Sequence, residues 1–531
     1  MSAPRPTAQH TPDPGLSRRT LGAPAITFMI IAASAPLTVI AGGVTTSFAV
    51  TGSLGVPLGF LVIAVILTVF AVGYTAMGRH ITNAGAFYAY ISQGLGRAAG
   101  VGAALIALVA YNAMQIGIFG LFGFQLSMFL ETKFGISTPW WAWIIGGIAL
   151  VGVLGMNKID VSAKVLGVLV ALEFLVVIVF DVYAIAAAPE GVSTATLNPA
   201  ELFGPSLGIV LVFGVAAFMG FEGAAIYGEE AKDPKRTVPR ATYAAVAIIG
   251  LFYAFSAWAF SVGVGPSHIV AASQESGPDL MFVFMSDHVS VLFVDVMNIL
   301  FLTSLFAALQ SFHNAVARYF FSLGREGVLP AWFARTGPSG APWAGSIAQT
   351  VIALVVTAGF ALAGDAFGGA AALGEQSFLY PVLTMFTWLT NTGAMALVML
   401  MAVIAAAVIG FFAKDRRGLG LWPTVVAPLT SGALLAWVFV MIIANFHVQM
   451  GQESPAPSTY VLPVIVALAG VIGVVWGLVL RATRPAIYER IGRGTEPGAY
   501  GTELVDVIAT ARTAGTDGTT GTARTAGTAG A

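Results

Sequence analysis

Apolar runs of about 20 residues recur along almost the whole of this chain, and each is long enough to cross the roughly 30 Å hydrocarbon core of a bilayer as a helix. Membrane-spanning β-strands would instead be short segments that alternate between apolar and polar residues, so the runs predict helices. The twelve predicted spans lie at about 24–50, 55–78, 99–128, 140–156, 164–187, 206–228, 241–264, 288–320, 343–363, 378–411, 423–446 and 459–480.

Composition agrees with this interpretation. Of the 531 residues, 57% are hydrophobic and only 9% are charged, whereas soluble domains carry about 25% charged residues. We therefore expect the lipid bilayer as a partner, and no nucleic acid. Cysteine is absent, which excludes disulfides and thiolate metal sites. We expect neither a metal nor a cofactor.

Positive charge is distributed unevenly between the loops. If both termini lie in the cytoplasm, Lys133 is the only one of the 24 lysines and arginines that falls on an outer loop. Inner loops of membrane proteins are enriched in Lys and Arg. We therefore predict a multi-pass protein of the cytoplasmic membrane with both termini inside. Acidic residues such as Glu190 and Glu275 fall on the predicted outer loops.

The two ends of the chain differ from the apolar region between them. Residues 1–20 are polar and rich in proline, and they lack a signal-peptide cleavage pattern, so they predict a disordered cytoplasmic tail. Residues 481–531 predict a low-complexity cytoplasmic tail, because the sequence after about Thr495 repeats Gly, Ala and Thr and has too few large apolar residues to fold. The membrane domain is predicted over residues 21–480.

The first predicted span contains an interruption. Ala32–Ala35 are small residues, and Pro36 follows them. Proline lacks a backbone donor and disfavours helical geometry at the residue before it. We predict a break at Ser34 and Ala35, with Pro36 at the first position of a second half-helix, where proline is well tolerated.

The sixth span has a weaker interruption of the same kind. Gly214, Gly220 and Gly223 lie close together and predict a break centred on Phe218–Gly220. The two breaks fall at corresponding places in the two halves of the chain, which is typical of inverted repeats with a binding site at the membrane midplane. Freed amides favour an anion and freed carbonyls a cation, so a zwitterionic amino acid fits both. The alternative is that Gly and Pro are simply common in membrane helices.

The segment that follows the second break, GFEGAAIYGEEAKDPKRTVPRA, resembles a motif of the amino acid, polyamine and organocation (APC) superfamily of permeases. Two further segments, NAGAFYAYISQGLGRAAG from Asn83 and ARYFFSLGREGVLPAWFA from Ala317, resemble other parts of that family. The resemblance covers residues from about 20 to 480. The residues that carry it in the first motif are Phe218, Gly220, Phe221, Glu222, Glu229, Glu230, Pro234, Arg236, Pro239 and Ala241.

This resemblance implies an all-α membrane protein with 12 transmembrane helices. Ten of them would form a LeuT-type 5+5 inverted repeat in which helices 1 and 6 are broken, and two would be peripheral. It also implies a secondary active transporter of amino acids or related amines that works by alternating access and is coupled to protons. The implied repeats and peripheral helices cover about 21–187, 206–411 and 423–480.

The resemblance also implies where a substrate would bind. The family's first-helix motif, Gly-Ser-Gly, reads Ala33, Ser34 and Ala35 here, and alanine restricts the backbone more than glycine does. For any polar or aromatic candidate, an interhelical hydrogen bond or simple packing is the alternative role. The implied substrate-binding residues are Ala33, Ser34, Ala35, Ala216, Ala217, Phe218, Gly220, Tyr111, Asn112 and Phe312, and further candidates are Gln115, His313, Asn314, Trp388 and Asn391.

Glu222 and Glu173 are the candidate coupling or gating residues. An acid within a membrane span is costly and functional by default, and resemblance to an arginine/agmatine exchanger of the family implies a coupling carboxylate at Glu222. The charged cluster after it, which begins at Glu229 and Glu230, would pair across an inner gate or would form a solvated helix end.

Glu173 aligns with a lysine that is thought to replace a sodium ion against helix one in a proton-coupled family member. Three interpretations stay open for this carboxyl group: a protonated structural group, a second proton carrier, or a group that attracts a cationic amine. Sodium coupling through Thr303 and Ser304 is an alternative, although these residues fall about one turn from the position that it needs.

Other function classes have weaker support. The sequence contains no H-E-x-x-H motif, no nucleophile motif with a partnered base and no ATP-binding loop, so we expect neither an enzyme nor a primary pump. The remaining alternatives to an amino acid transporter are a polyamine/amino acid exchanger and a transport-inactive nutrient sensor.

Overall fold

A computed structural model describes residues 20–494 except 82, 158, 205, 451 and 453. Of the predicted tails, 1–20 and 481–531, residues 1–19 and 495–531 lie outside the described residues. Within the described part every regular element is helical, apart from one isolated β-bridge between Leu21 and Ala231.

Ten helical segments in the described part are long and apolar enough to cross a membrane. Two shorter apolar helices, α7 (Trp140–Gly155) and α10 (Leu207–Ala217), coincide with two further predicted spans, and the predicted count of twelve includes them. Six of the ten segments are a single helix or part of one: α4 (Val56–Gly78), α6 (Arg97–Phe134), residues Gly167–Ala187 of α8 (Ile159–Ala187), α12 (Pro234–Val264), α15 (Val291–Arg325) and α20 (Val461–Thr483). The other four are longer than the α-helices within them: Ala23–Thr51 (α1 to α3), Trp343–Ala366 (α16, Trp343–Ala361), Pro381–Lys414 (α17, Thr387–Lys414) and Trp422–Ala444 (α18, Ala427–Ala444).

The first segment is interrupted at a single residue. Helix α1 (Ala23–Ser34) ends at Ala35, which has the left-handed backbone conformation (φ 51°, ψ 75°), and α2 (Pro36–Thr38) begins immediately afterwards. A non-glycine residue adopts this conformation at a cost of roughly 1–2 kcal/mol. Pro36 occupies the first helical position, and the helix then continues through a π-helical stretch to α3 (Thr45–Thr51). The interruption is narrower than expected, because Ser34 remains helical.

The sixth segment is interrupted over several residues. Helix α10 (Leu207–Ala217) is followed by turns at residues 218–222, and the short helix α11 (Gly223–Ile226) comes after them. Gly220 has a φ of 103°, and a Cβ placed on it would lie 2.6 Å from the Cβ of Ala33. The absence of a side chain at Gly220 therefore lets the two interrupted segments touch.

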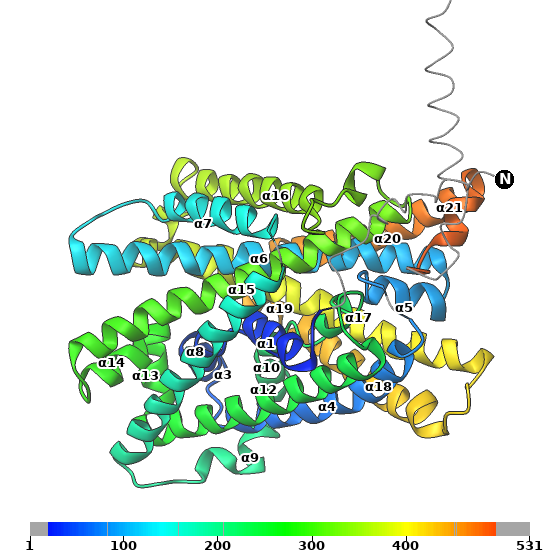
Figure 1. Cartoon of the computed structure of the whole chain (residues 1–531). Helices are drawn as coiled ribbons and strands as arrows, with labels where there is room; N and C mark the ends of the chain where they lie inside the picture. Colours follow the sequence, from blue (N-terminus) through cyan, green and yellow to red (C-terminus); the bar gives the residue numbers. More distant parts are fainter. Residues whose placement is uncertain are drawn as a thin grey trace, which may run out of the picture. The chain divides into compact units, whose positions relative to one another are not determined.

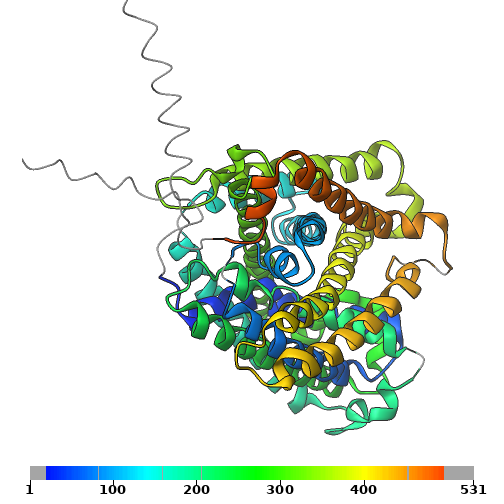
Figure 2. The same ribbon diagram turned by 90° about the vertical axis from the view of Figure 1, so that its right-hand side faces the viewer.

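Both interrupted segments lie among the longer helices. Figure 1 shows α1 and α10 near the middle of the bundle, with α8, α12 and α15 around them, and α1 contacts each of these three helices. In Figure 2, α6 is seen nearly end-on, with α20 and α17 beside it.

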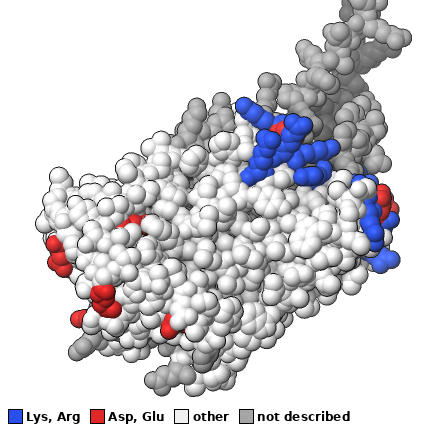
Figure 3. Space-filling view, turned by 90° about the horizontal axis from the view of Figure 1, so that it is seen from below, with Lys and Arg blue, Asp and Glu red and all other residues white. Residues whose placement is uncertain are grey.

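The charged side chains are segregated along the molecule. Figure 3 shows Lys and Arg gathered toward one end of the visible face, whereas most of the Asp and Glu residues lie toward the other end. The predicted orientation puts the basic end in the cytoplasm.

Helix α20 packs closely on α6, and at Gly473 the two backbones approach each other directly. A Cβ placed on Gly473 would lie 2.7 Å from both the Cα of Gly102 and the carbonyl oxygen of Val101. The indole of Trp476 donates a hydrogen bond to the carbonyl oxygen of Val328 (3.0 Å). The chain continues past residue 480, where the predicted domain ended, into α21 (Pro485–Arg490) and on to Gly494.

We predict that Gly473→Ala destabilises the protein by about 1–3 kcal/mol, because the added methyl group meets backbone atoms of α6 that cannot rotate away. Gly359 of α16 has no atom within 4 Å of an added Cβ. Gly359→Ala is therefore the matched control. Because alanine has a higher helix propensity than glycine, this variant should be up to about 1 kcal/mol more stable than the wild type. Thermal unfolding of the purified variants measures both effects, and equal melting temperatures would contradict this packing.

Candidate functional site

Ser34 joins the two interrupted segments. Its hydroxyl group lies at the end of α1 and donates a hydrogen bond to the carbonyl oxygen of Ala217 (2.7 Å), at the end of α10. The Tyr253 hydroxyl of α12 lies 2.5 Å from the Ser34 hydroxyl oxygen. Because the Ser34 proton goes to Ala217, the tyrosine is the donor to Ser34. A carbonyl group freed by the second break is thus satisfied from the first.

Glu222 lies at the second break and is buried, with 2% of its surface exposed. The Tyr111 hydroxyl of α6 donates to Oε1 (2.8 Å), and the amide of Gly220 donates to Oε2 (3.0 Å). The Tyr74 hydroxyl of α4 donates to the carbonyl oxygen of Glu222 (2.8 Å). All of these partners are uncharged, and one of them is an amide of the interrupted backbone.

Glu173 of α8 lies at the first break and is fully buried. The Ser304 hydroxyl of α15 donates to Oε2 (2.6 Å), and the amide of Leu37 lies 3.5 Å from the same oxygen. Oε1 has no hydrogen-bond partner within the described residues. The sequence placed Ser304 about one turn from a sodium position. In the structure its hydroxyl group bonds the Glu173 carboxyl group, which lies beside the first break.

Each break therefore has a buried acid beside its freed amides. A carboxyl group in such surroundings can gain or lose a proton while its hydroxyl donors stay in place. Within the described residues no group of three or more His, Cys, Asp or Glu side chains is arranged to hold a metal ion.

Aromatic rings surround the Glu222 contact. The ring of Tyr111 lies 6.2 Å from that of Phe312 and 5.6 Å from that of Tyr319, measured between centroids. Phe218 is buried, and a Cβ placed on Gly250 of α12 would lie 3.4 Å from its ring. Ala216 is partly buried beside the core.

Other predicted residues bond elsewhere. The Asn112 amide donates to the carbonyl oxygen of Leu108 in its own helix (2.7 Å), and its Oδ1 has no partner in the described chain. The ring of His313 bonds to Ser346 of α16 (2.6 Å). The remaining candidates make these contacts: Gln115 donates to the Leu309 carbonyl oxygen and accepts from Gln349, Gln310 donates to Asn314, Asn391 donates to the Gln449 carbonyl oxygen, and the ring nitrogen of Trp388 has no partner among the described residues.

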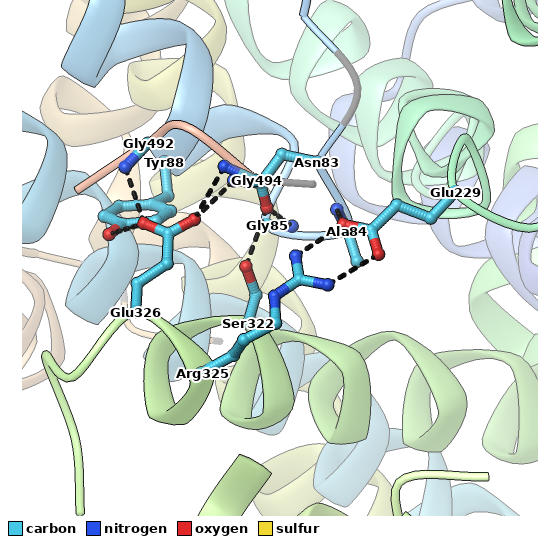
Figure 4. Close-up of polar contacts among 10 residues, drawn as sticks. All are labelled: Asn83, Ala84, Gly85, Tyr88, Glu229, Ser322, Arg325, Glu326, Gly492 and Gly494. Carbon is cyan, nitrogen blue, oxygen red and sulfur yellow. Dashed lines mark hydrogen bonds and ion pairs between the residues drawn. The ribbon is translucent and has the colours of Figure 1, made fainter. Parts of the chain in front are cut away.

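The charged cluster after the second break is paired to α15. Arg318 donates to both oxygens of Glu230 (2.6 and 3.3 Å) and lies over the ring of Tyr227, 4.8 Å from its centroid. Arg325 donates to both oxygens of Glu229 (2.8 and 2.6 Å), as Figure 4 shows. Removing one partner from a buried pair of this kind costs about 3–5 kcal/mol.

The sequence named the acids of these pairs but not their partners. Arg318 and Arg325 are seven residues apart, which puts them two turns apart on one face of α15. That spacing is a signal that could have identified them. Tyr253, a single tyrosine in an apolar run, carried no comparable signal.

Comparison with known proteins identifies the family of this chain. The family model described as amino acid permease matches residues 21–469. The low-affinity putrescine importer PlaP of Escherichia coli K12 is 24% identical over 60% of this chain and 69% of its own. The lysine-specific permease LysP of the same strain is 27% identical over 72% of this chain and 76% of its own.

A solved structure supports the fold. The crystal structure of MhsT in complex with L-phenylalanine has a TM-score of 0.53 and 15% sequence identity, and the match covers 80% of this chain and 99% of that one. This likeness shows an all-α, LeuT-type fold. Because the family model spans most of the sequence, the chain belongs to the amino acid permease family of the APC superfamily.

Proposed function

We propose that this permease is a secondary active transporter that moves amino acids or related amines across the cytoplasmic membrane, coupled to protons, by alternating access. The observation that carries the proposal is the pair of interrupted segments joined through Ser34 and Ala217, with a buried carboxyl group at each break. Interrupted helices supply backbone amides and carbonyls to a substrate in the middle of a bilayer.

The surroundings of Glu222 support proton coupling. Its bonded partners are a tyrosine hydroxyl and a backbone amide, and neither carries a charge. An ionised acid in the membrane interior is costly without a counter-ion, so binding a proton stabilises the closed site. A substrate that carries an ammonium group would stabilise the ionised form instead.

The pairs on α15 support alternating access. Glu229 and Glu230 follow the second break, whereas their partners Arg325 and Arg318 belong to a different helix. An opening toward this end of the molecule must separate both pairs. We assign them to an inner gate that is closed in this structure.

The relatives support the choice of substrate class. The names of the similar proteins specify putrescine, lysine, histidine, asparagine and branched-chain amino acids. All of these compounds carry an amino group, and all except putrescine also carry a carboxylate. We therefore propose an amino acid or an amine as the substrate.

Uptake into proteoliposomes tests the proposal. With an inwardly directed proton gradient, we expect one of these labelled compounds to accumulate above its external concentration, and empty liposomes are the control. Uptake that requires preloaded substrate would indicate an exchanger instead. Binding without uptake would indicate a sensor, and a requirement for external sodium would replace proton coupling.

We predict that Glu222→Gln abolishes accumulation against a gradient, while exchange between equal substrate pools persists, because glutamine keeps the size of the side chain and one acceptor oxygen but cannot release a proton. Wild-type uptake should rise as the external pH falls, and uptake by the variant should not respond to pH. Glu275→Gln is the control, since Glu275 is exposed at the predicted outer face. A pH-dependent accumulation by the Glu222 variant would remove this role.

Glu173→Gln distinguishes the three interpretations of that residue. We expect a flattened pH profile, because Oε1 has no partner among the described residues and is free to take a proton. Unchanged uptake at every pH would make Glu173 structural, and a selective loss of affinity for cationic substrates would make it a binding group. Ser304→Ala removes the hydroxyl donor to the carboxyl group and should alter the same property as Glu173→Gln.

A further inference from the structure

The chain after α21 returns to the inner gate. The amide of Gly492 donates to Oε2 of Glu326 (2.5 Å), and the amide of Gly494 lies 3.2 Å from Oε1. Figure 4 shows both backbone nitrogens directed at this one carboxyl group. Two hydrogen bonds thus tie the end of the described chain to α15, more than 160 residues earlier in the sequence.

Glu326 is an acceptor that three separate segments share. It follows the last residue of α15, and 2% of its surface is exposed. The Tyr88 hydroxyl of α5 (Phe87–Gly94) donates to Oε2 (2.6 Å), and the Asn83 amide donates to Oε1 (2.7 Å). Burial raises the pKa of Glu326, and its hydrogen bonds from Tyr88, Gly492 and Asn83 act against that rise.

The segment Ile491–Gly494 is closely fitted to its surroundings. Ile491 is buried, and the side-chain amide of Gln93 donates to the carbonyl oxygen of Gly492 (3.1 Å). Gly492 has a φ of 77°, and a Cβ placed on it would lie 2.6 Å from the Cβ of Ser92. This position therefore accepts glycine alone without a rearrangement.

The same carboxyl group connects to the gate through the loop before α5. Ser322 of α15 and the amide of Gly85 both donate to Oδ1 of Asn83, whose own amide group donates to Glu326. The next residue, Ala84, donates its amide to Oε1 of Glu229 (2.9 Å). The loop is therefore held between Glu326 on one side and the acid of the gate on the other.

We propose that Ile491–Gly494 is a strap that holds the inner gate closed, and that Glu326 is the positioning residue through which it acts. The proposal rests on the proposed function, since a gate is meaningful only in a transporter that alternates. With the strap removed, Glu326 loses two of its four donors. The carboxyl group of Glu326 then becomes more mobile, and its hydrogen bond from Asn83 breaks more often. The neighbouring residue, Ala84, separates more readily from Glu229 as a result.

The absence of cysteine makes a direct test possible, because one introduced thiol is the only thiol in the chain. Ala84 is buried, and its contact with Glu229 is made by the backbone, so Ala84→Cys keeps that bond. Reaction with a membrane-impermeant maleimide in inside-out vesicles then reports how often the loop leaves the gate. Reaction of the same variant in denaturant gives the rate for a fully exposed thiol.

We predict that a chain ending at Arg490 reacts at least about tenfold faster than the full chain, since each hydrogen bond to a charged group is worth roughly that factor or more. A chain ending at Gly494 keeps both amides that bond Glu326, so it should react at the rate of the full chain. Equal rates for the two truncated chains would overturn the strap.

A point substitution tests the same idea in the full chain. Gly492→Ala meets Ser92 and should raise the reaction rate, as the truncation does. Gly418→Ala is the matched control, because Gly418 has a φ of 76° and no atom within 4 Å of an added Cβ. If both alanine variants react alike, backbone strain alone explains the effect and the strap is wrong. Melting temperatures of both variants identify a loss of folding.

Labelling and uptake separate the two proposals. If the wild-type protein transports none of the compounds but the rates differ as predicted, the transport proposal fails and the segment still holds Ala84 in place. If uptake is found and the rates do not differ, the transport proposal stands and the strap fails.

Discussion

The bilayer interior offers no water to a backbone group that a helix break releases, and the arrangement of this permease follows from that constraint. The Ala217 carbonyl group is satisfied by Ser34, and the Gly220 amide by Glu222. The first of these contacts joins two helices, whereas the second is made within one segment, two residues further along the chain. The breaks therefore determine where α6, α12 and α15 can lie, since these helices supply Tyr111, Tyr253 and Ser304.

The parts of the fold that depend on local sequence were predictable. Apolar runs located the spans, and Pro36 located the first interruption to within one residue, because both signals act on their immediate neighbours. The acids at 173 and 222 were also recognisable, since an acid in an apolar run is conspicuous by itself. The roles of these acids and of the pocket residues stay predictions.

Pairings between distant segments were not predictable. Glu230 and Arg318 are 88 residues apart, and Asn83 and Glu326 are 243 apart. The spacing of Arg318 and Arg325 puts both on one face of α15, but no pattern shows which residues face them, because that proximity arises only when the whole bundle is assembled. The sequence likewise assigned residues 481–494 to a tail, since five charged residues and few apolar ones give no sign that Ile491 and Gly492 fit beside α5.

The close contact between α6 and α20 determines how these two helices can move. Where the two backbones touch, no flexible side chain lies between them that could absorb sliding, so Gly102 and Gly473 fix the register of the two helices. A helix that is peripheral by its place in the chain thereby becomes a rigid extension of a central one. Any displacement of α6 during a transport cycle would carry α20 with it, and the outer surface of the molecule would move against the surrounding lipid.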